Sequence, residues 1–244
     1  MGVKKYFNKQ LKVSMFGLEH DIAPDFYLGC WQNNRSCVPL LCVRGILCAG
    51  NIAIVVTSMV LLRNIMNGFG LWWIYLTHWG VLANALTTIF AFGLSLRVYY
   101  RGPIGKTLYI INNISYFNFL VEFYDMDTTL DVFLHAINSV SMLALMATTR
   151  HPSRLLHFHH TVVFAILYLV FNLIYYYAGG TDPNGNVWIY PMLDWSSPGT
   201  ASVVVVGVAI GLILLHELVV LIVLCRDYYG RRYRKEDRSF SVSQ

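Results

Sequence analysis

Long runs of apolar residues alternate with short polar segments along most of the chain. Six of these runs are long enough to cross a bilayer as helices, because a spanning helix needs roughly 17 to 25 mostly apolar residues. The pattern predicts an all-α protein built as a six-helix transmembrane bundle. The predicted spans are residues 38–62, 70–96, 107–123, 129–148, 155–178 and 200–225.

The remaining residues form two polar ends around this membrane domain. We expect residues 1–37 to be an N-terminal tail, residues 38–225 the six-span domain, and residues 226–244 a basic, disordered C-terminal tail. The first 37 residues lack the short apolar core of a cleavable signal. Hydrophobic residues make up 56% of the chain and charged residues only 13%. A soluble domain carries about a quarter charged residues, so this composition excludes the soluble class.

The distribution of basic residues predicts the orientation in the membrane. Sixteen of the 18 Lys and Arg residues lie in the two tails and in the segments near residues 97–106 and 149–154. The segments on the opposite side hold only Arg63. Because basic residues concentrate on the cytosolic side, we expect both termini in the cytosol. Since the net charge of +5 follows this pattern, nucleic-acid binding is not predicted.

Three polar residues in the predicted spans form a candidate catalytic set. Thr77 and His135 lie on different helices, each six or seven residues inside the outer end of its span, and so at similar depth. An imidazole within reach of a hydroxyl can take its proton and activate it as a nucleophile. Asp131, one helical turn before His135, is placed to orient the ring. The alternative is structural, with Thr77 bonding its own helix backbone and His135 a neighbouring helix.

Other buried or clustered polar residues predict structural roles. Arg44 and Glu217 lie at similar depth near the cytosolic side, so we expect an ion pair with His216 beside it. The clustered His157, His159 and His160 fit an edge that faces lipid headgroups better than a metal site. We therefore predict no metal and no cofactor.

The longest predicted outer loop spans residues 179–198. Its first half is dense in turn residues, and its second half, Val-Trp-Ile-Tyr-Pro-Met-Leu-Asp-Trp, is apolar and aromatic. We expect the second half to fold back onto the helix ends as a cap. Because the other outer loops are short, this aromatic loop is the expected contact for any membrane-protein partner.

Five sequence motifs stand out along the chain. They are Trp-Gln at 31–32, Ile-Tyr-Leu-Thr-His-Trp at 74–79, Leu-His-Ala-Ile-Asn at 134–138, Gly-Gly-Thr-Asp-Pro at 179–183 and Ile-Tyr-Pro-Met-Leu-Asp-Trp at 189–195. These motifs resemble the Rolling stone family of animal membrane proteins, and the resemblance extends over nearly the whole chain. It implies a multi-pass protein at the cell surface, and the founding member of the family is linked to myoblast fusion.

A more distant resemblance is to the androgen-induced and androgen-dependent transmembrane threonine hydrolases, which cleave fatty-acid esters of hydroxy fatty acids. Leu76-Thr77 is similar to the motif of their nucleophile, and Trp188-Ile189-Tyr190-Pro191 to their outer motif. Their His-x-x-His motif corresponds here to His135-Ala-Ile-Asn138. Asn cannot act as a base at neutral pH, so catalysis in this chain would require His135 as the base.

Three functions follow from these patterns. The first is a Rolling stone-like protein of the plasma membrane, or alternatively the endoplasmic reticulum, that acts in cell–cell interaction or fusion. The second is an intramembrane hydrolase of fatty-acid esters, with an acyl lipid held in the bundle. The third is a channel or transporter, which is disfavoured because the sequence lacks repeats and a file of charges through the membrane.

Overall fold

The computed structural model describes residues 3–17, 19–20, 22–33, 36–65, 70–103, 107–108 and 133–234. Six α-helices and one pair of two-residue antiparallel strands make up most of these residues. They are α1 (Val3–Gln10), α2 (Val38–Ile65), α3 (Leu76–Arg101), α5 (Asn138–Thr148), α6 (Phe158–Tyr177), α7 (Pro198–Arg234), β1 (Glu19–His20) and β2 (Thr107–Leu108).

Shorter helical turns precede or connect these helices. Five are 3-10 turns, and one, which leads directly into α5, is a turn of π-helix. They are η1 (Val13–Phe16), η2 (Ala23–Phe26), η3 (Gly70–Ile74), the π-helical η5 (Phe133–Ile137), η6 (Leu155–His157) and η7 (Pro191–Leu193).

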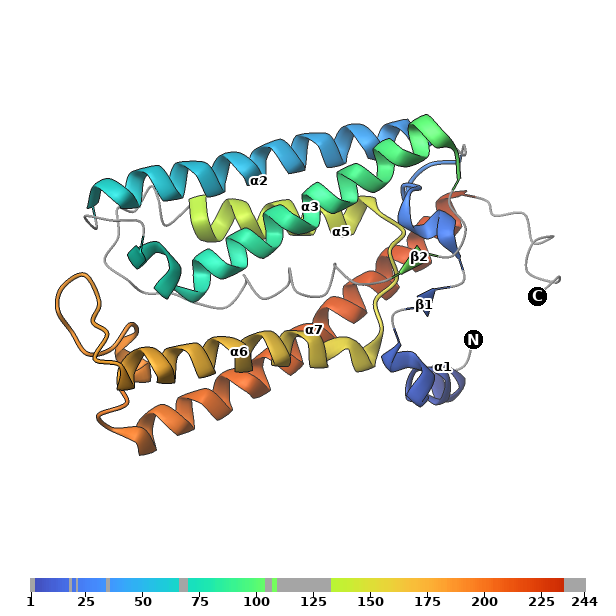
Figure 1. Cartoon of the computed structure of the whole chain (residues 1–244). Helices are drawn as coiled ribbons and strands as arrows, with labels where there is room; N and C mark the ends of the chain where they lie inside the picture. The colour runs from blue at the N-terminus through green and yellow to red at the C-terminus, as the bar shows by residue number, and fades with distance from the viewer. Residues whose placement is uncertain are drawn as a thin grey trace.

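The long helices form two groups (Figure 1). In the first group α2 packs along α3, and α5 lies against both; in the second, α6 packs against α7. The groups meet where the C-terminal half of α7 reaches the end of α5. Figure 1 also shows that α3 and α5 run in the same direction.

The predicted helical class is confirmed, and four helices in the described part of the chain are long and apolar enough to cross a membrane. They are Val38–Arg63, Leu76–Arg101, Leu155–Tyr177 and Pro198–Arg234, which correspond to four of the predicted spans. Apart from β2, the predicted span 107–123 lies outside the described residues. The predicted span 129–148 is described from Phe133 onward, as η5 and the short α5. Six crossings and cytosolic termini remain predictions.

Two predicted boundaries are wrong. The second span was expected to begin near residue 70, but residues 70–74 form η3 and α3 begins at Leu76 after the extended Tyr75. Thr77 is therefore in the first turn of α3, not two turns inside it. The last helix was expected to end at Cys225, with a disordered tail from residue 226, but α7 continues to Arg234.

The main hydrophobic core lies at the end of the bundle that carries the 179–198 loop. The second half of this loop folds onto the helix ends, as predicted, because Ile189 and Tyr190 are both buried there. The backbone N–H of Leu76 donates to the Tyr190 hydroxyl at 2.7 Å, and the Tyr168 hydroxyl donates to the Ile74 carbonyl at 2.7 Å. The core also contains Ile54, Leu62, Trp72, Tyr75, Val81 and Leu134.

Candidate functional site

A continuous set of buried polar side chains lies between α2, α3 and α5, and we call it the polar seam. On α2 its members are Arg44, Asn51 and Ser58, which are spaced seven residues apart and therefore share one helix face. In an otherwise apolar helix, this face can be buried only if neighbouring helices offer hydrogen-bond partners. The other members are His78, Asn84, Thr88 and Ser95 on α3, and Asn138 and Ser141 on α5.

Hydrogen bonds join the seam across the three helices. Arg44 Nη1 donates to the Ser95 hydroxyl at 2.7 Å and to the Ala91 carbonyl at 3.1 Å, both on α3. The Asn51 side chain exchanges hydrogen bonds with the Ser141 hydroxyl on α5, each at 3.3 Å. Polar side chains of α2 thus bond to α3 at Arg44 and to α5 at Asn51.

The predicted ion pair between Arg44 and Glu217 is wrong. Arg44 is only 3% exposed and faces α3, and its Nε has no hydrogen-bond partner. Within the described residues, no carboxylate lies at ion-pair distance from Arg44. Glu217 belongs to α7 in the other helix group, and the expected neighbour His216 bonds instead to the Arg154 carbonyl at 2.9 Å. Similar depth in the membrane did not mean contact, because α2 packs against α3 rather than α7.

The Asn84 and Asn138 amides form the central contact of the seam. The Asn84 Nδ2 group donates to Asn138 Oδ1, which ties the middle of α3 to the start of α5. Two atoms of this pair, Asn84 Oδ1 and Asn138 Nδ2, are buried and have no hydrogen-bond partner. In the stretch His135-Ala-Ile-Asn138, the Asn138 side chain therefore makes a structural contact.

This contact fixes the register of the two predicted catalytic residues. Thr77 precedes Asn84 by seven residues on the same face of α3, which places it about 10 Å farther along the helix. His135 precedes Asn138 by three residues within the π-helical turn, so it lies nearer to the Asn84–Asn138 contact than Thr77 does. Thr77 and His135 are both half-buried, and they lie at the same end of a parallel helix pair.

The catalytic arrangement itself remains a prediction. Among the described residues, no hydrogen bond joins the Thr77 hydroxyl to the His135 ring. Asp131 lies outside the residues that the structure describes. His135 is in the π-helical turn, and such turns occur frequently at functional sites.

His78 is a further polar residue at this end of the seam. It is 1% exposed, and its ring stacks on Trp72 at a centroid distance of 4.6 Å and an angle of 4°. Its Nδ1 lies 2.6 Å from the Trp72 carbonyl. Since a carbonyl only accepts, Nδ1 carries the proton and Nε2 is an acceptor, and this Nε2 is buried without a partner. The Trp72 indole is held in turn by the Ser58 hydroxyl at 3.2 Å.

The sequence contained a signal for His78 that our prediction did not use. His78 follows Thr77 directly and sits in the aromatic run from Trp72 to Trp79. An imidazole in such an apolar setting needs a backbone partner, and the carbonyl six residues earlier supplies it. The turn η5, which carries His135, contacts α3, which carries His78.

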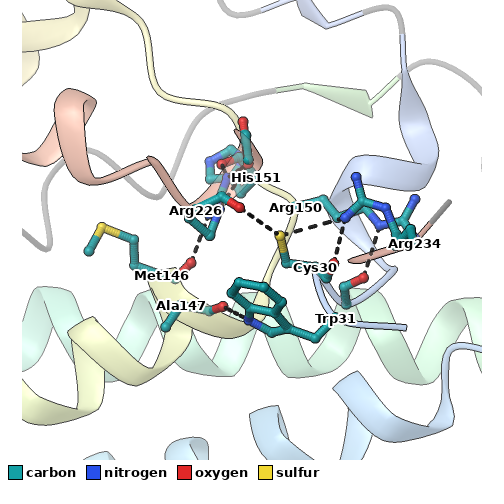
Figure 2. Close-up of polar contacts among 10 residues, drawn as sticks. Cys30, Trp31, Met146, Ala147, Arg150, His151, Arg226 and Arg234 are labelled. Atoms are coloured by element: carbon teal, nitrogen blue, oxygen red, sulfur yellow. Dashed lines mark hydrogen bonds and ion pairs between the residues drawn. The ribbon is translucent and has the colours of Figure 1, made fainter. Parts of the chain in front are cut away.

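A second polar region, which we call the cap, closes the opposite end of the bundle; it comprises residues 22–33 and the arginines around them, Arg150, Arg226 and Arg234, and Figure 2 shows its polar contacts. The Cys30 backbone N–H donates to the Thr148 carbonyl at 2.8 Å, and the Trp31 indole donates to the Ala147 carbonyl at 2.7 Å. The cap thereby satisfies carbonyls at the C-terminal end of α5, which have no partners within their own helix.

The arginines of the cap join it to α5 and α7. Arg226 on α7 is buried and donates to the Met146 carbonyl at 2.7 Å and to the His151 carbonyl at 2.8 Å, while also pairing with Asp227 at 2.7 Å. Arg150 donates to the Gly29 carbonyl at 2.9 Å, and Arg234 donates to the Cys30 carbonyl.

The close approach of α7 to the cap explains why this helix continues to Arg234. Cys30 is fully buried, and a Cβ at Gly230 would lie only 2.5 Å from its Sγ. Only glycine fits at this contact. Basic residues after an apolar run are usually taken as a solvated flank, and that assumption concealed the packed role of Arg226.

A small cavity lies between the polar seam and the cap. It has room for about one water molecule, so it is not an acyl-chain site. The buried Thr149 hydroxyl has no hydrogen-bond partner and faces this space, which makes it a natural water ligand. The cavity is lined by Thr87, Met142, Leu145, Met146, Thr149, His151 and Arg226.

The histidines at the start of α6 bond to backbone carbonyls. His159 Nδ1 lies 2.6 Å from the Leu156 carbonyl, and His160 Nδ1 lies 3.2 Å from the His157 carbonyl. In the part of the chain that the structure describes, no group of three or more His, Cys, Asp or Glu side chains could hold a metal ion.

Comparison with known proteins agrees with the motifs and the helical architecture. The family model described as Protein rolling stone matches residues 93–243, more than half of the chain. The chain is also 26% identical over 234 residues to Protein rolling stone of Drosophila melanogaster, with 84% of each sequence covered. No solved structure matches. The chain belongs to the Rolling stone family of membrane proteins.

Proposed function

We propose that this Rolling stone family protein acts at the plasma membrane, in cell–cell interaction or fusion, with both termini in the cytosol. The observation that carries the proposal is the family membership. The described part of the chain adds four helices of membrane-spanning length and the aromatic 179–198 loop. This loop and the neighbouring η3 present apolar side chains that the bundle does not cover. The exposed side chains are Trp73, Val187 and Met192.

The loop is rigid enough to serve as a recognition surface. The Asp182 carboxylate accepts hydrogen bonds from the backbone N–H groups of Asn184 at 2.9 Å and Asn186 at 2.7 Å. At the other end of the loop, the Trp195 indole donates to Asn172 on α6 at 2.6 Å. A surface that is already ordered loses little conformational entropy when it binds a partner.

A cell-mixing assay tests this function. Two populations of cells that express the protein and carry different cytosolic dyes are mixed, and dye exchange or cell pairing is counted. We expect the double variant Val187→Ser/Met192→Ser to reduce the signal by about tenfold, because it removes the apolar contact but leaves the buried Tyr190 in place. The matched control is Ser196→Ala, an exposed position in the same loop.

Surface labelling must show equal amounts of all three proteins at the plasma membrane. Unchanged mixing in the double variant would exclude the loop as the contact surface. Absence of the wild-type protein from the cell surface would exclude the cell-surface function altogether.

A second function, hydrolysis of fatty-acid esters inside the membrane, is supported by the position of Thr77 in the first turn of α3 and of His135 in η5, which contacts α3. In this reaction the Thr77 oxygen bonds to the ester carbonyl carbon while His135 takes the hydroxyl proton. Cleavage of the ester C–O bond, with that proton passing to the departing alcohol, leaves an acyl group on Thr77. Water then releases the fatty acid.

The hydrolase function is tested with purified protein in detergent and an ester of a hydroxy fatty acid. We expect Thr77→Val to lower turnover by about a hundredfold or more, and Thr77→Ser to retain part of it, because serine keeps the nucleophilic oxygen. Thr57→Val is the matched control, since Thr57 is exposed on α2. Equal turnover by Thr77→Val and the wild type would refute the hydrolase function.

A further inference from the structure

The first part of the chain, residues 3–17, exposes apolar side chains although it belongs to no spanning helix. We call it the N-terminal segment; it comprises α1 and η1. Leu11 is 60% exposed and Val13 is 83% exposed, and Phe7 and Phe16 are exposed as well. On α7 such exposure is expected, because lipid surrounds a spanning helix. Outside the spans, a group of exposed apolar side chains this close in sequence indicates an interaction surface.

Basic side chains accompany this apolar group. Lys4 and Lys12 are exposed at the two ends of the stretch that contains Phe7 and Leu11. The sequence from residue 3 to residue 17 contains four lysines and no acidic residue. Apolar side chains beside lysines are suited to bind the interface of an anionic bilayer. There the acyl chains accept the apolar groups and the negatively charged headgroups attract the lysines.

The opposite side of the segment is fixed to the helices. Tyr6 on α1 buries its hydroxyl, and its pKa is raised by burial and by the nearby carboxylates of Glu217 and Asp227 on α7. The Gly17 carbonyl accepts hydrogen bonds from Arg154 Nη1 at 2.6 Å and from His157 Nε2 at 3.3 Å. The segment is therefore held in one orientation, with its apolar side chains facing outward.

The position of these contacts places the segment at the membrane boundary. The spanning stretch that contains α6 begins at Leu155, and the segment touches the residues on either side of that point. The Phe16 ring also contacts His159, in the first turn of α6, at a centroid distance of 5.4 Å. Figure 1 shows α1 beside the start of α6, at the same end of the molecule as the C-terminus of α7.

We propose that the N-terminal segment is an interfacial anchor that inserts Phe7, Leu11 and Val13 into the leaflet where α6 begins, with Lys4 and Lys12 on anionic headgroups. The occupant of this surface is the lipid bilayer itself. An isolated helix of eight residues is marginal in water, so α1 depends on the surfaces that hold it. The lipid supplies the side that the protein leaves open.

Hydrogen exchange measured by mass spectrometry tests the anchor in the full-length protein. The protein is reconstituted in nanodiscs of phosphatidylcholine alone, or with about 30% phosphatidylserine, and exchange of residues 3–17 is followed. We expect exchange to be about tenfold slower with phosphatidylserine, and this difference to shrink at about 0.5 M NaCl as charges are screened.

Two variants separate insertion from simple attraction. Leu11→Ser/Val13→Ser removes exposed apolar groups without touching the Tyr6 or Gly17 contacts, and should exchange about as fast with phosphatidylserine as the wild type does without it. Asn8→Ser, also exposed, is the matched control and should retain the slow exchange. Exchange in α2 must be equal in all proteins, which establishes that the bundle is intact. The proposal would be overturned if exchange of residues 3–17 in the wild type were the same with and without phosphatidylserine. It would also be overturned if the double variant exchanged as slowly as the wild type with phosphatidylserine.

Discussion

The polar seam and the cap both bury polar side chains, but they satisfy them in different ways. In the cap, long arginine side chains reach carbonyls at the ends of helices and on the connecting segments, as Arg226 does with Met146 and His151. In the seam, mostly short side chains bond to one another or to carbonyls within the helices, and atoms of Arg44, Asn84, Asn138 and His78 are left without partners.

This difference between the cap and the seam indicates which region contributes more to stability and which carries any activity. A helix end offers free carbonyls, so a buried arginine there can be satisfied by the fold alone. In a helix interior the carbonyls already accept from their own helix, so a polar residue there must share one of them, as Arg44 does with Ala91, or bond to another side chain, to water or to a ligand. We therefore expect substitutions in the cap to lower the free energy of unfolding more than substitutions in the seam do. We expect substitutions in the seam to have the larger effect on any activity.

The largest expected effect is that of Arg226→Leu, which removes the central donor of the cap. The Met146 and His151 carbonyls would lose their partner, and we expect the free energy of unfolding to fall by about 3 to 5 kcal/mol. Thermal unfolding in detergent measures the change. Arg231→Leu is the control, because Arg231 is exposed on the same helix. Equal melting temperatures for Arg226→Leu and Arg231→Leu would show that the buried arginine of the cap does not dominate stability.

Gly230→Ala tests the close contact between α7 and Cys30. The added Cβ meets the Cys30 Sγ at 2.5 Å, so we expect a loss of about 1 to 3 kcal/mol. Gly207→Ala on the same helix has open space around its Cβ and should be neutral or slightly stabilising. The same unfolding measurement, made on both variants, compares the two glycines. A Gly230→Ala protein as stable as the wild type would show that the end of α7 does not pack closely against the cap.

The seam is tested by a double-mutant cycle at Asn84 and Asn138. Replacing one Asn with Leu leaves the other amide buried and unpaired, and we expect each single variant to lose about 1 kcal/mol. The double variant should recover most of this loss, because no unpaired amide remains. Unfolding of all four proteins gives the coupling free energy. Additive losses would mean that the two amides do not act as a pair.

The smallest effect is expected for Ser58→Ala, which removes the acceptor of the Trp72 indole. We expect a loss of about 0.5 to 1 kcal/mol in stability, since one buried hydrogen bond is broken. Trp72 supports His78, so the change should also appear in the imidazole signals of His78 by NMR. Ser202→Ala on an exposed position of α7 is the control. Unchanged His78 signals would show that Ser58 does not orient this ring.

The sequence predicted the four long helices well because their length and apolar content are local properties. It did not reveal the start of α3, because Trp72 and Tyr75 are as apolar as a helix interior and hydropathy does not register the turn at residues 70–74. It did not reveal the length of α7 either, because the packing of Gly230 on Cys30 joins residues 200 positions apart.

The candidate site was predictable only in part. Thr77 and His135 were chosen by residue type and depth, and the structure places them at the same end of neighbouring helices. Which residues of α2 face α3 depends on helix rotation, so Arg44 was assigned to Glu217 instead of Ser95. The seven-residue spacing of Arg44, Asn51 and Ser58 was the available signal for the polar seam.

The π-helical turn that carries His135 has a consequence for how members of this family diverge. A π turn holds more residues than an α turn, so deleting one residue from 133–137 would restore α geometry. Five residues of a π turn go about as far around the axis as four of an α turn, so the residues on either side of the deletion would keep their faces of the helix. A single-codon deletion at position 135 could thus remove the imidazole from this site while every flanking residue stays in place.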